Sequence, residues 1–148
     1  MPLAVKRLDH VGFPTDDLDR TRALCEGVLG LEPIPSLATG FGRYRLAWYR
    51  DDTGVEYHVS LRMPDLPDMA GTGFNQSLYP HVAFEVESLE DAKAELERDG
   101  LEYHELKDGG VLVRKQLYVL LEEFGLMLEL FETRKNVEPR YVPPEETR

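Results

Sequence analysis

The sequence is short of cysteine, of basic residues and of long apolar runs. Cys25 is the only cysteine, which excludes an intramolecular disulfide and is typical of a protein of the reducing cytoplasm. We expect its thiol on the buried face of a helix, where it behaves as a small hydrophobic group rather than as a nucleophile.

The shortage of positive charge limits the possible partners. Lysine and arginine number 17 against 28 acidic residues, a net charge of −11, which disfavours binding to a nucleic-acid backbone. The cluster of Arg43, Arg45 and Arg50 could attract an anionic group of a small substrate, although a solvated strand face explains at least two of the three. No apolar run approaches the roughly 18 residues of a membrane span, and the N-terminal segment, charged from Lys6, is unlike a signal peptide. We expect a cytoplasmic protein with neither nucleic-acid nor membrane partners.

The 148 residues, 42% of them hydrophobic, suit one globular domain or two small modules that share a core. An internal repeat favours the second arrangement. Residues 9–14 (Asp-His-Val-Gly-Phe-Pro) align with residues 80–85 (Pro-His-Val-Ala-Phe-Glu). In the same alignment of the two halves, His10 matches His81, and His58 matches Glu129. A duplicated module that repeats candidate ligand positions indicates one metal centre built from both halves.

The first module is expected at residues 1–62. Alternation predicts a strand over Val5–Phe13, and a helix follows from Asp16 or Asp17 to Gly30. A loop that contains Pro33 then leads to a hairpin. The buried helix positions should be Leu18, Cys25 and Val28, and the hairpin strands should be Arg43–Arg50 and Val55–Leu61.

After a linker at residues 63–79, the second module at residues 80–135 repeats the plan. A helix capped by Ser88 ends at Gly100. The expected strands are Tyr79–Val86, Leu101–Glu105, Lys115–Glu122 and Leu126–Glu132. The Pro-rich tail at residues 136–148 is expected to be extended or disordered. The predicted fold class is therefore α+β, with two tandem βαβββ modules whose curved mixed sheets form a cup around a metal site.

These motifs resemble the vicinal oxygen chelate superfamily, which includes glyoxalase I, methylmalonyl-CoA epimerase, extradiol dioxygenases and bleomycin and fosfomycin resistance proteins. The resemblance covers about Leu8 to Phe131 and rests on five segments. They are Leu8–Gly12 (Leu-Asp-His-Val-Gly), Asp17–Asp19 (Asp-Leu-Asp), Val28–Leu31 (Val-Leu-Gly-Leu), Pro80–Phe84 (Pro-His-Val-Ala-Phe) and Gly125–Leu130 (Gly-Leu-Met-Leu-Glu-Leu). The matching family positions bind one divalent metal, so the resemblance implies the ligands His10, His58, His81 and Glu129.

Histidine and carboxylate donors without thiolate suit iron, nickel, zinc, manganese or cobalt. Four ligands leave two adjacent positions for a substrate that chelates through neighbouring oxygens. Glu129 would then also be the catalytic proton shuttle. If His58 instead hydrogen-bonds beside the metal, the remaining His10, His81 and Glu129 form the two-His, one-carboxylate triad of non-haem iron enzymes.

The resemblance implies foremost a metal-dependent isomerase or lyase similar to glyoxalase I. His58 departs from that pattern, because glyoxalase I-like sequences carry glutamate there and epimerases carry glutamine. An Fe(II) extradiol-type dioxygenase is the second reading, and a non-catalytic drug-binding protein is the third. His104 has no counterpart in the repeat and is expected at the surface, and Trp48, Tyr57 and Tyr118 are expected mainly to pack. We also predict a homodimer, and the sequence leaves open whether modules pair within or between chains.

Overall fold

A computed structural model describes residues 2–34, 46–65, 75–106 and 115–132 of the chain. The expected Pro-rich tail and the arginines at 43 and 45 lie outside these ranges. The described residues form one eight-stranded mixed sheet in the order β2-β3-β4-β1-β5-β8-β7-β6. The first half of the chain supplies β1 Val5–Thr15, β2 Glu32–Ile34, β3 Leu46–Arg50 and β4 Glu56–Leu61. The second half supplies β5 His81–Val86, β6 His104–Leu106, β7 Lys115–Leu121 and β8 Leu126–Glu132.

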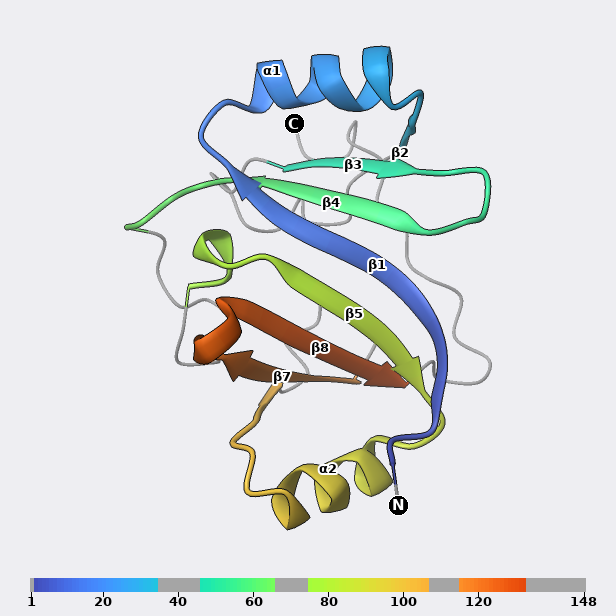
Figure 1. Cartoon of the computed structure of the whole chain (residues 1–148), viewed down its shortest axis with the longest axis vertical. Coiled ribbons are helices and arrows are strands. Elements are labelled where there is room, and N and C mark those ends of the chain that lie inside the picture. Colours follow the sequence, from blue (N-terminus) through green and yellow to red (C-terminus); the bar gives the residue numbers. More distant parts are fainter. Residues whose placement is uncertain (1, 35–45, 66–74, 107–114, 133–148) are drawn as a thin grey trace, which may run out of the picture.

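Each half follows the expected βαβββ plan, which confirms the predicted fold class. Helix α1, Leu18–Arg22, continues into a π-helical segment η1, Ala23–Val28, and α2 covers Leu89–Arg98. Figure 1 shows the two helices at opposite ends of the molecule, with β1 and β5 running between them. Two short 3-10 turns, η3 Gln76–Leu78 and η4 Glu122–Phe124, precede β5 and β8.

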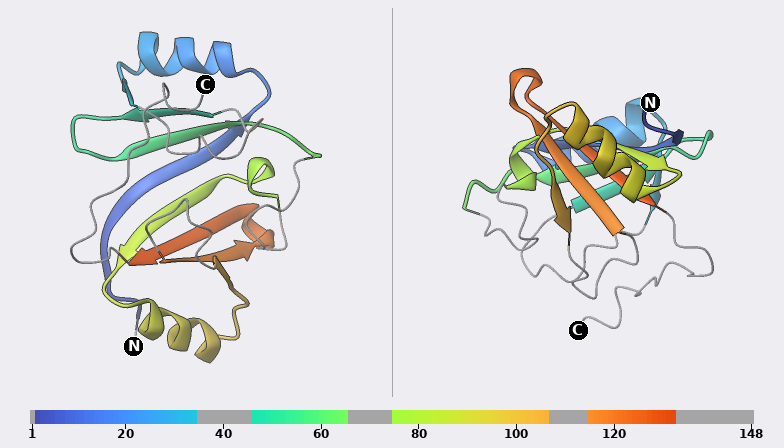
Figure 2. Two further views of the ribbon diagram at one scale, coloured as in Figure 1. Left: turned by 180° about the vertical axis from the view of Figure 1, so that it is seen from behind. Right: turned by 90° about the horizontal axis from the view of Figure 1, so that it is seen from below.

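The two halves join within one chain. Strand β1 pairs antiparallel with β5, and each of these strands pairs parallel with the last strand of its own module, β4 or β8. Figure 2 shows the same arrangement from behind and from below. In the described residues, this chain's own modules pair with each other. The homodimer stays a prediction.

Alternation along the strands divides the sheet into a helix-covered face and an opposite face. Under α1 and η1 the buried cluster is Leu18, Cys25, Tyr49 and Val59. Under α2 it is Val86, Leu89, Ala92, Leu96, Leu117, Val119 and Leu130. Cys25 is buried, as the sequence predicted. The residues between these apolar positions point to the other face, where the candidate ligands lie.

Two local predictions were wrong. Val28 was expected in the core but is 76% exposed, because the segment is π-helical: Leu29 N–H donates to Leu24 O, five residues back, so each turn is wider and the buried face shifts. Pro33 was expected in a loop but lies in β2, paired with Tyr49. An edge strand tolerates a proline because one row of its backbone groups has no partner strand.

None of the helices in the described ranges is long and apolar enough to cross a membrane.

The cap of α2 provides a stability test. Ser88 Oγ accepts a hydrogen bond from Asp91 N–H at 3.2 Å, and Glu132 Oε2 accepts one from Leu89 N–H at 2.9 Å. Because Ser88→Ala leaves the Asp91 amide without its acceptor, the free energy of unfolding in urea should fall by about 1 kcal/mol. An unchanged value would show that the Glu132 contact alone caps the helix.

Candidate metal centre

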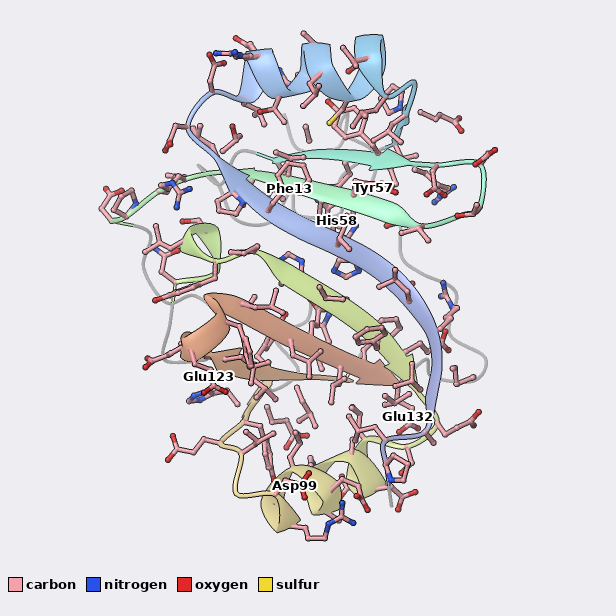
Figure 3. All side chains as sticks on the ribbon, in the orientation of Figure 1. Phe13, Tyr57, His58, Asp99, Glu123 and Glu132 are labelled. Atoms are coloured by element: carbon pink, nitrogen blue, oxygen red, sulfur yellow. The ribbon has the colours of Figure 1, made fainter. Side chains whose placement is uncertain are left out.

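The four residues predicted as ligands come together at the middle of the sheet. They lie on the adjacent strands β4, β1, β5 and β8, as His58, His10, His81 and Glu129. Gly12 on β1 pairs with His58 on one side and with His81 on the other, and Ala83 on β5 lies between His10 and Glu129. Figure 3 shows His58 near this central position. The small side chains at positions 12 and 83 leave room for the rings.

The distances suit a divalent cation. His10 Nε2 lies 3.4 Å and His81 Nε2 4.0 Å from Glu129 Oε2. His10, His58 and His81 each offer a ring nitrogen within 4.8 Å of the other two. Ligand atoms about 2.0–2.2 Å from one ion lie roughly 3–4 Å from each other, so the donors need only small movements to surround an ion. The chemistry of the set, imidazole and carboxylate, fits the group that the sequence implied.

The position of the His81 ring depends on Gly12, the residue opposite it on β1, which has no side chain. Its ring lies directly against the backbone of Gly12, and a Cβ atom built at Gly12 would overlap the ring atoms Cε1, Nε2 and Nδ1. Only glycine therefore permits this position of the ring. Burial also lowers the pKa of His81 to about 4, so the ring is neutral at physiological pH and its nitrogen can bind a metal.

His10 and Glu129 form a buried pair of opposite charge. Burial opposes protonation of His10, but the charge of Glu129 and a hydrogen bond with Asp9 outweigh it and raise the pKa of His10 to about 9. Burial likewise opposes ionisation of Glu129, yet the charge of His10 holds the pKa of this carboxyl at about 2. A metal ion at the centre must therefore replace the proton of His10.

Glu129 is also held on its other oxygen. Gln116 Nε2 donates a hydrogen bond to Glu129 Oε1, and Tyr118 Oη donates to Gln116 Oε1 at 3.4 Å. All three side chains are buried. One oxygen of Glu129 is thus occupied and the other, Oε2, is directed toward the histidines.

His58 differs from the other histidines in its surroundings. Its ring is stacked between the indole of Trp48 and the ring of His10. The centroids of His58 and Trp48 are 3.8 Å apart with planes at 5°, and those of His58 and His10 are 3.9 Å apart with planes at 22°. Imidazole nitrogens bind metals in the plane of the ring. Two rings that lie face to face therefore cannot both direct a lone pair at one ion, which favours His58 beside the metal rather than on it.

A carboxylate and an arginine hold His58 in place. His58 Nε2 donates to Glu56 Oε2 at 2.9 Å, and Arg50 binds Glu56 Oε1 at 2.9 Å. Burial opposes the ionisation of Glu56, but hydrogen bonds from His58 and Arg50 lower its pKa to about 2. Because a carboxylate only accepts, Nε2 of His58 carries the proton and Nδ1 remains an acceptor. Burial lowers the pKa of the His58 ring, so it is neutral at physiological pH.

Sequence reasoning missed part of this arrangement. Trp48 was expected mainly to pack, yet it stacks on His58, and its buried Nε1–H has no acceptor among the described residues. Asp9, Glu56 and Gln116 were not singled out. The alternation of β4 could have identified Glu56, since residues two apart share a face, whereas Gln116 needs the β7–β8 register.

The remaining candidates lie apart from the centre. Tyr57 is on the helix-covered face, where its hydroxyl donates to Asp51 Oδ2 at 2.9 Å in the β3–β4 turn. His104 was expected at the surface but is half-buried in β6, paired with Tyr118.

A Gly12→Ala substitution tests the packing of His81. The added methyl group must displace the His81 ring, so we expect a loss of about 1–3 kcal/mol in unfolding free energy and a changed His81 imidazole signal in NMR spectra. Gly27→Ala is the matched control, since a Cβ atom at Gly27 meets nothing within 4 Å. An unperturbed His81 signal in Gly12→Ala would contradict this packing.

Comparison with solved structures supports the fold. Methylmalonyl-CoA epimerase from Mycobacterium tuberculosis superposes with a TM-score of 0.63 at 17% identity, over 90% of this chain and 92% of that one. An epimerase from Streptomyces coelicolor, solved with 2-nitronate-propionyl-CoA, gives 0.52 at 19% identity over 87% and 98%. A catechol 2,3-dioxygenase gives 0.56 at 17% identity, over 86% of this chain but only 40% of that one.

Sequence comparison places the chain in a family. A search of curated protein sequences found no significant match. The sequence profile of one superfamily, however, matches residues 9–112, which include three of the four predicted ligands. With the paired βαβββ modules described above, this match shows that the chain belongs to the Glyoxalase/Bleomycin resistance protein/Dioxygenase superfamily.

Proposed function

We propose that this protein is a divalent-metal-dependent enzyme, an isomerase or lyase acting on a small substrate that binds through neighbouring oxygen atoms. The observation that carries the proposal is the convergence of His10 Nε2, His81 Nε2 and Glu129 Oε2 from both modules. These three residues would hold the metal. When bound, the metal would act as a Lewis acid that stabilises negative charge on the substrate oxygens.

His58 is the side chain best suited to move a proton. Its ring is neutral, its Nε2–H is fixed by Glu56, and its Nδ1 can accept a proton. A base held in one orientation by a carboxylate is the arrangement that general base catalysis requires. Glu129, the proton shuttle expected from the sequence, is a weaker base, because Gln116 and His10 stabilise its ionised form. We therefore assign Glu129 to metal binding and His58 to proton transfer.

Trp48 would contribute to substrate binding. Its indole lies against His58, and the buried Nε1–H lacks an acceptor among the described residues. A buried donor without a partner costs about 1–3 kcal/mol, and an oxygen atom of the bound substrate would remove that cost. One polar group of the substrate would then lie beside the proposed base.

An Fe(II)-dependent oxygenase is the second candidate, and the stacking of His58 favours it. With His58 off the metal, the ligands His10, His81 and Glu129 would form the two-His, one-carboxylate set of non-haem iron enzymes. The architecture favours the first candidate. The chain covers 92% of the epimerase but 40% of the dioxygenase, whose chain is much longer than one pair of modules.

Metal content tests the proposed ligands. In protein purified without a chelating tag, we expect near-stoichiometric metal in the wild type and its loss in His81→Ala and Glu129→Ala. His104→Ala is the matched control, because it removes a histidine outside the centre, and should retain the metal. A wild type that binds none of iron, nickel, zinc, cobalt or manganese after reconstitution would contradict the proposal and leave a non-catalytic binding protein.

The identity of the bound metal separates the two reactions. Iron directs the next assay to oxygen consumption with catechols. Nickel, zinc, cobalt or manganese directs it to solvent deuterium exchange at C–H groups beside carbonyls, followed by NMR. We expect exchange that is lost in His58→Ala while the metal remains bound. Loss of the metal in His58→Ala would contradict the placement of His58 beside the ion.

The affinity for metal should depend on pH through His10. The pKa of His10 is about 9 in the metal-free protein, and that of His81 is about 4. Between these values His10 alone must lose a proton to bind, so about one proton should be released per metal ion at pH 7. Affinity should rise about tenfold per pH unit up to about pH 9 and then level off. Calorimetry in buffers of different ionisation enthalpy measures this release, and no release would contradict the charged state of His10.

A further inference from the structure

Strand β1 contains an extra residue immediately before His10. Leu8 pairs with Phe84 and His10 pairs with Ala83, so Asp9 has no opposing residue on β5. Such a bulge disturbs the strict alternation of the strand and re-aims a side chain. Asp9 and His10 are consequently both buried, at 6% and 4% exposure, although they are neighbours in a strand.

The bulge brings the carboxylate of Asp9 to Nδ1 of His10, the ring nitrogen that does not face Glu129. His10 Nδ1 donates to Asp9 Oδ2 at 2.8 Å, while His10 Nε2 faces Glu129. Because a carboxylate cannot donate, this contact keeps the hydrogen on Nδ1 and leaves the Nε2 lone pair for a metal. The contact also fixes the rotation of the ring.

Asp9 is itself anchored by charged neighbours. Arg7 Nη2 lies 2.9 Å from Asp9 Oδ1, and Arg7 Nε lies 2.6 Å from Glu85 Oε2. Lys6 Nζ lies 3.4 Å from the other oxygen of Glu85. The planar guanidinium of Arg7 thus joins two buried carboxylates, one on β1 and one on β5. This network limits the orientations open to Asp9.

In the described part of the second module, no carboxylate holds His81 in the way that Asp9 holds His10. Pro80 occupies the position of Asp9 in the repeat and carries no carboxylate. His81 is instead fixed by packing against Gly12. The two repeat-related histidines are therefore positioned in different ways, one by a hydrogen bond and one by shape.

We propose that Asp9, anchored by Arg7, is a positioning residue that selects Nε2 of His10 as the metal-binding nitrogen and pre-orients the ring. This proposal rests on the proposed function, since it assigns a role toward the same metal. Carboxylates that hold the second nitrogen of a metal-binding histidine typically contribute 10–100-fold in metal affinity.

The first experiment compares zinc affinity by calorimetry in the wild type, Asp9→Ala, Asp9→Asn and Asp9→Glu. We expect about 10–100-fold weaker binding for Asp9→Ala, a smaller loss for Asp9→Asn, which keeps the shape, and partial recovery for Asp9→Glu. Glu132→Gln is the control, since it removes a carboxylate that caps α2. Zinc affinity within twofold of the wild type in a folded Asp9→Ala would overturn the proposal. If Asp9→Ala does not fold, the same result in Asp9→Asn would overturn it.

The second experiment needs no metal and separates this proposal from the proposed function. Nitrogen-15 NMR of the metal-free protein at pH 10, above the pKa of about 9 for His10, reports which ring nitrogen carries the hydrogen. We expect Nδ1–H in the wild type and a mixture of both tautomers in Asp9→Ala. An unchanged Nδ1–H form in Asp9→Ala would refute the role of Asp9. A wild type that shows Nδ1–H but binds no metal would refute the proposed function alone.

Discussion

The antiparallel pairing of β1 with β5 is the contact on which the rest of the structure depends. It joins two half-sheets, each with its own helix and its own buried cluster, into one sheet. Its register sets Gly12 opposite His81 and His10 opposite Ala83. A shift by one residue would turn these side chains to the helix-covered face. The pairing therefore fixes both the core of the protein and the position of its candidate metal centre.

The candidate metal centre contains ionisable side chains that are buried away from solvent. His10, Asp9 and Glu129 are buried with less than a tenth of their surface exposed, and such groups are costly unless they are paired. Without a metal, protonated His10 supplies the positive charge that pairs with the two carboxylates: its Nδ1 binds Asp9 and its Nε2 faces Glu129. A divalent cation would supply more positive charge at the same place. Under the proposed function, metal binding would offset the cost of burying these charged groups in the middle of the sheet.

Because the sequence contains an internal repeat, much of the fold and of the candidate metal centre could be predicted from it. The shared offset of His10 with His81 and of His58 with Glu129 indicated two equivalent modules, and β8 begins and ends where alternation placed it. What could not be predicted depends on irregular backbone or on pairing between distant strands. The bulge that turns Asp9 inward breaks the alternation, and the π-helical turns that expose Val28 break the helical period. The contact of Gln116 with Glu129 requires the register of the β7–β8 hairpin.

We propose above all that one chain holds one metal between its two modules. Crystals of the protein soaked with zinc, measured at the zinc absorption edge, test it most directly through the anomalous difference map. We expect one strong peak per chain, bonded to His10 Nε2, His81 Nε2 and Glu129 Oε2 of that same chain, with His58 stacked beside it. A peak elsewhere, or one bonded to histidines of one chain and the glutamate of another, would contradict it.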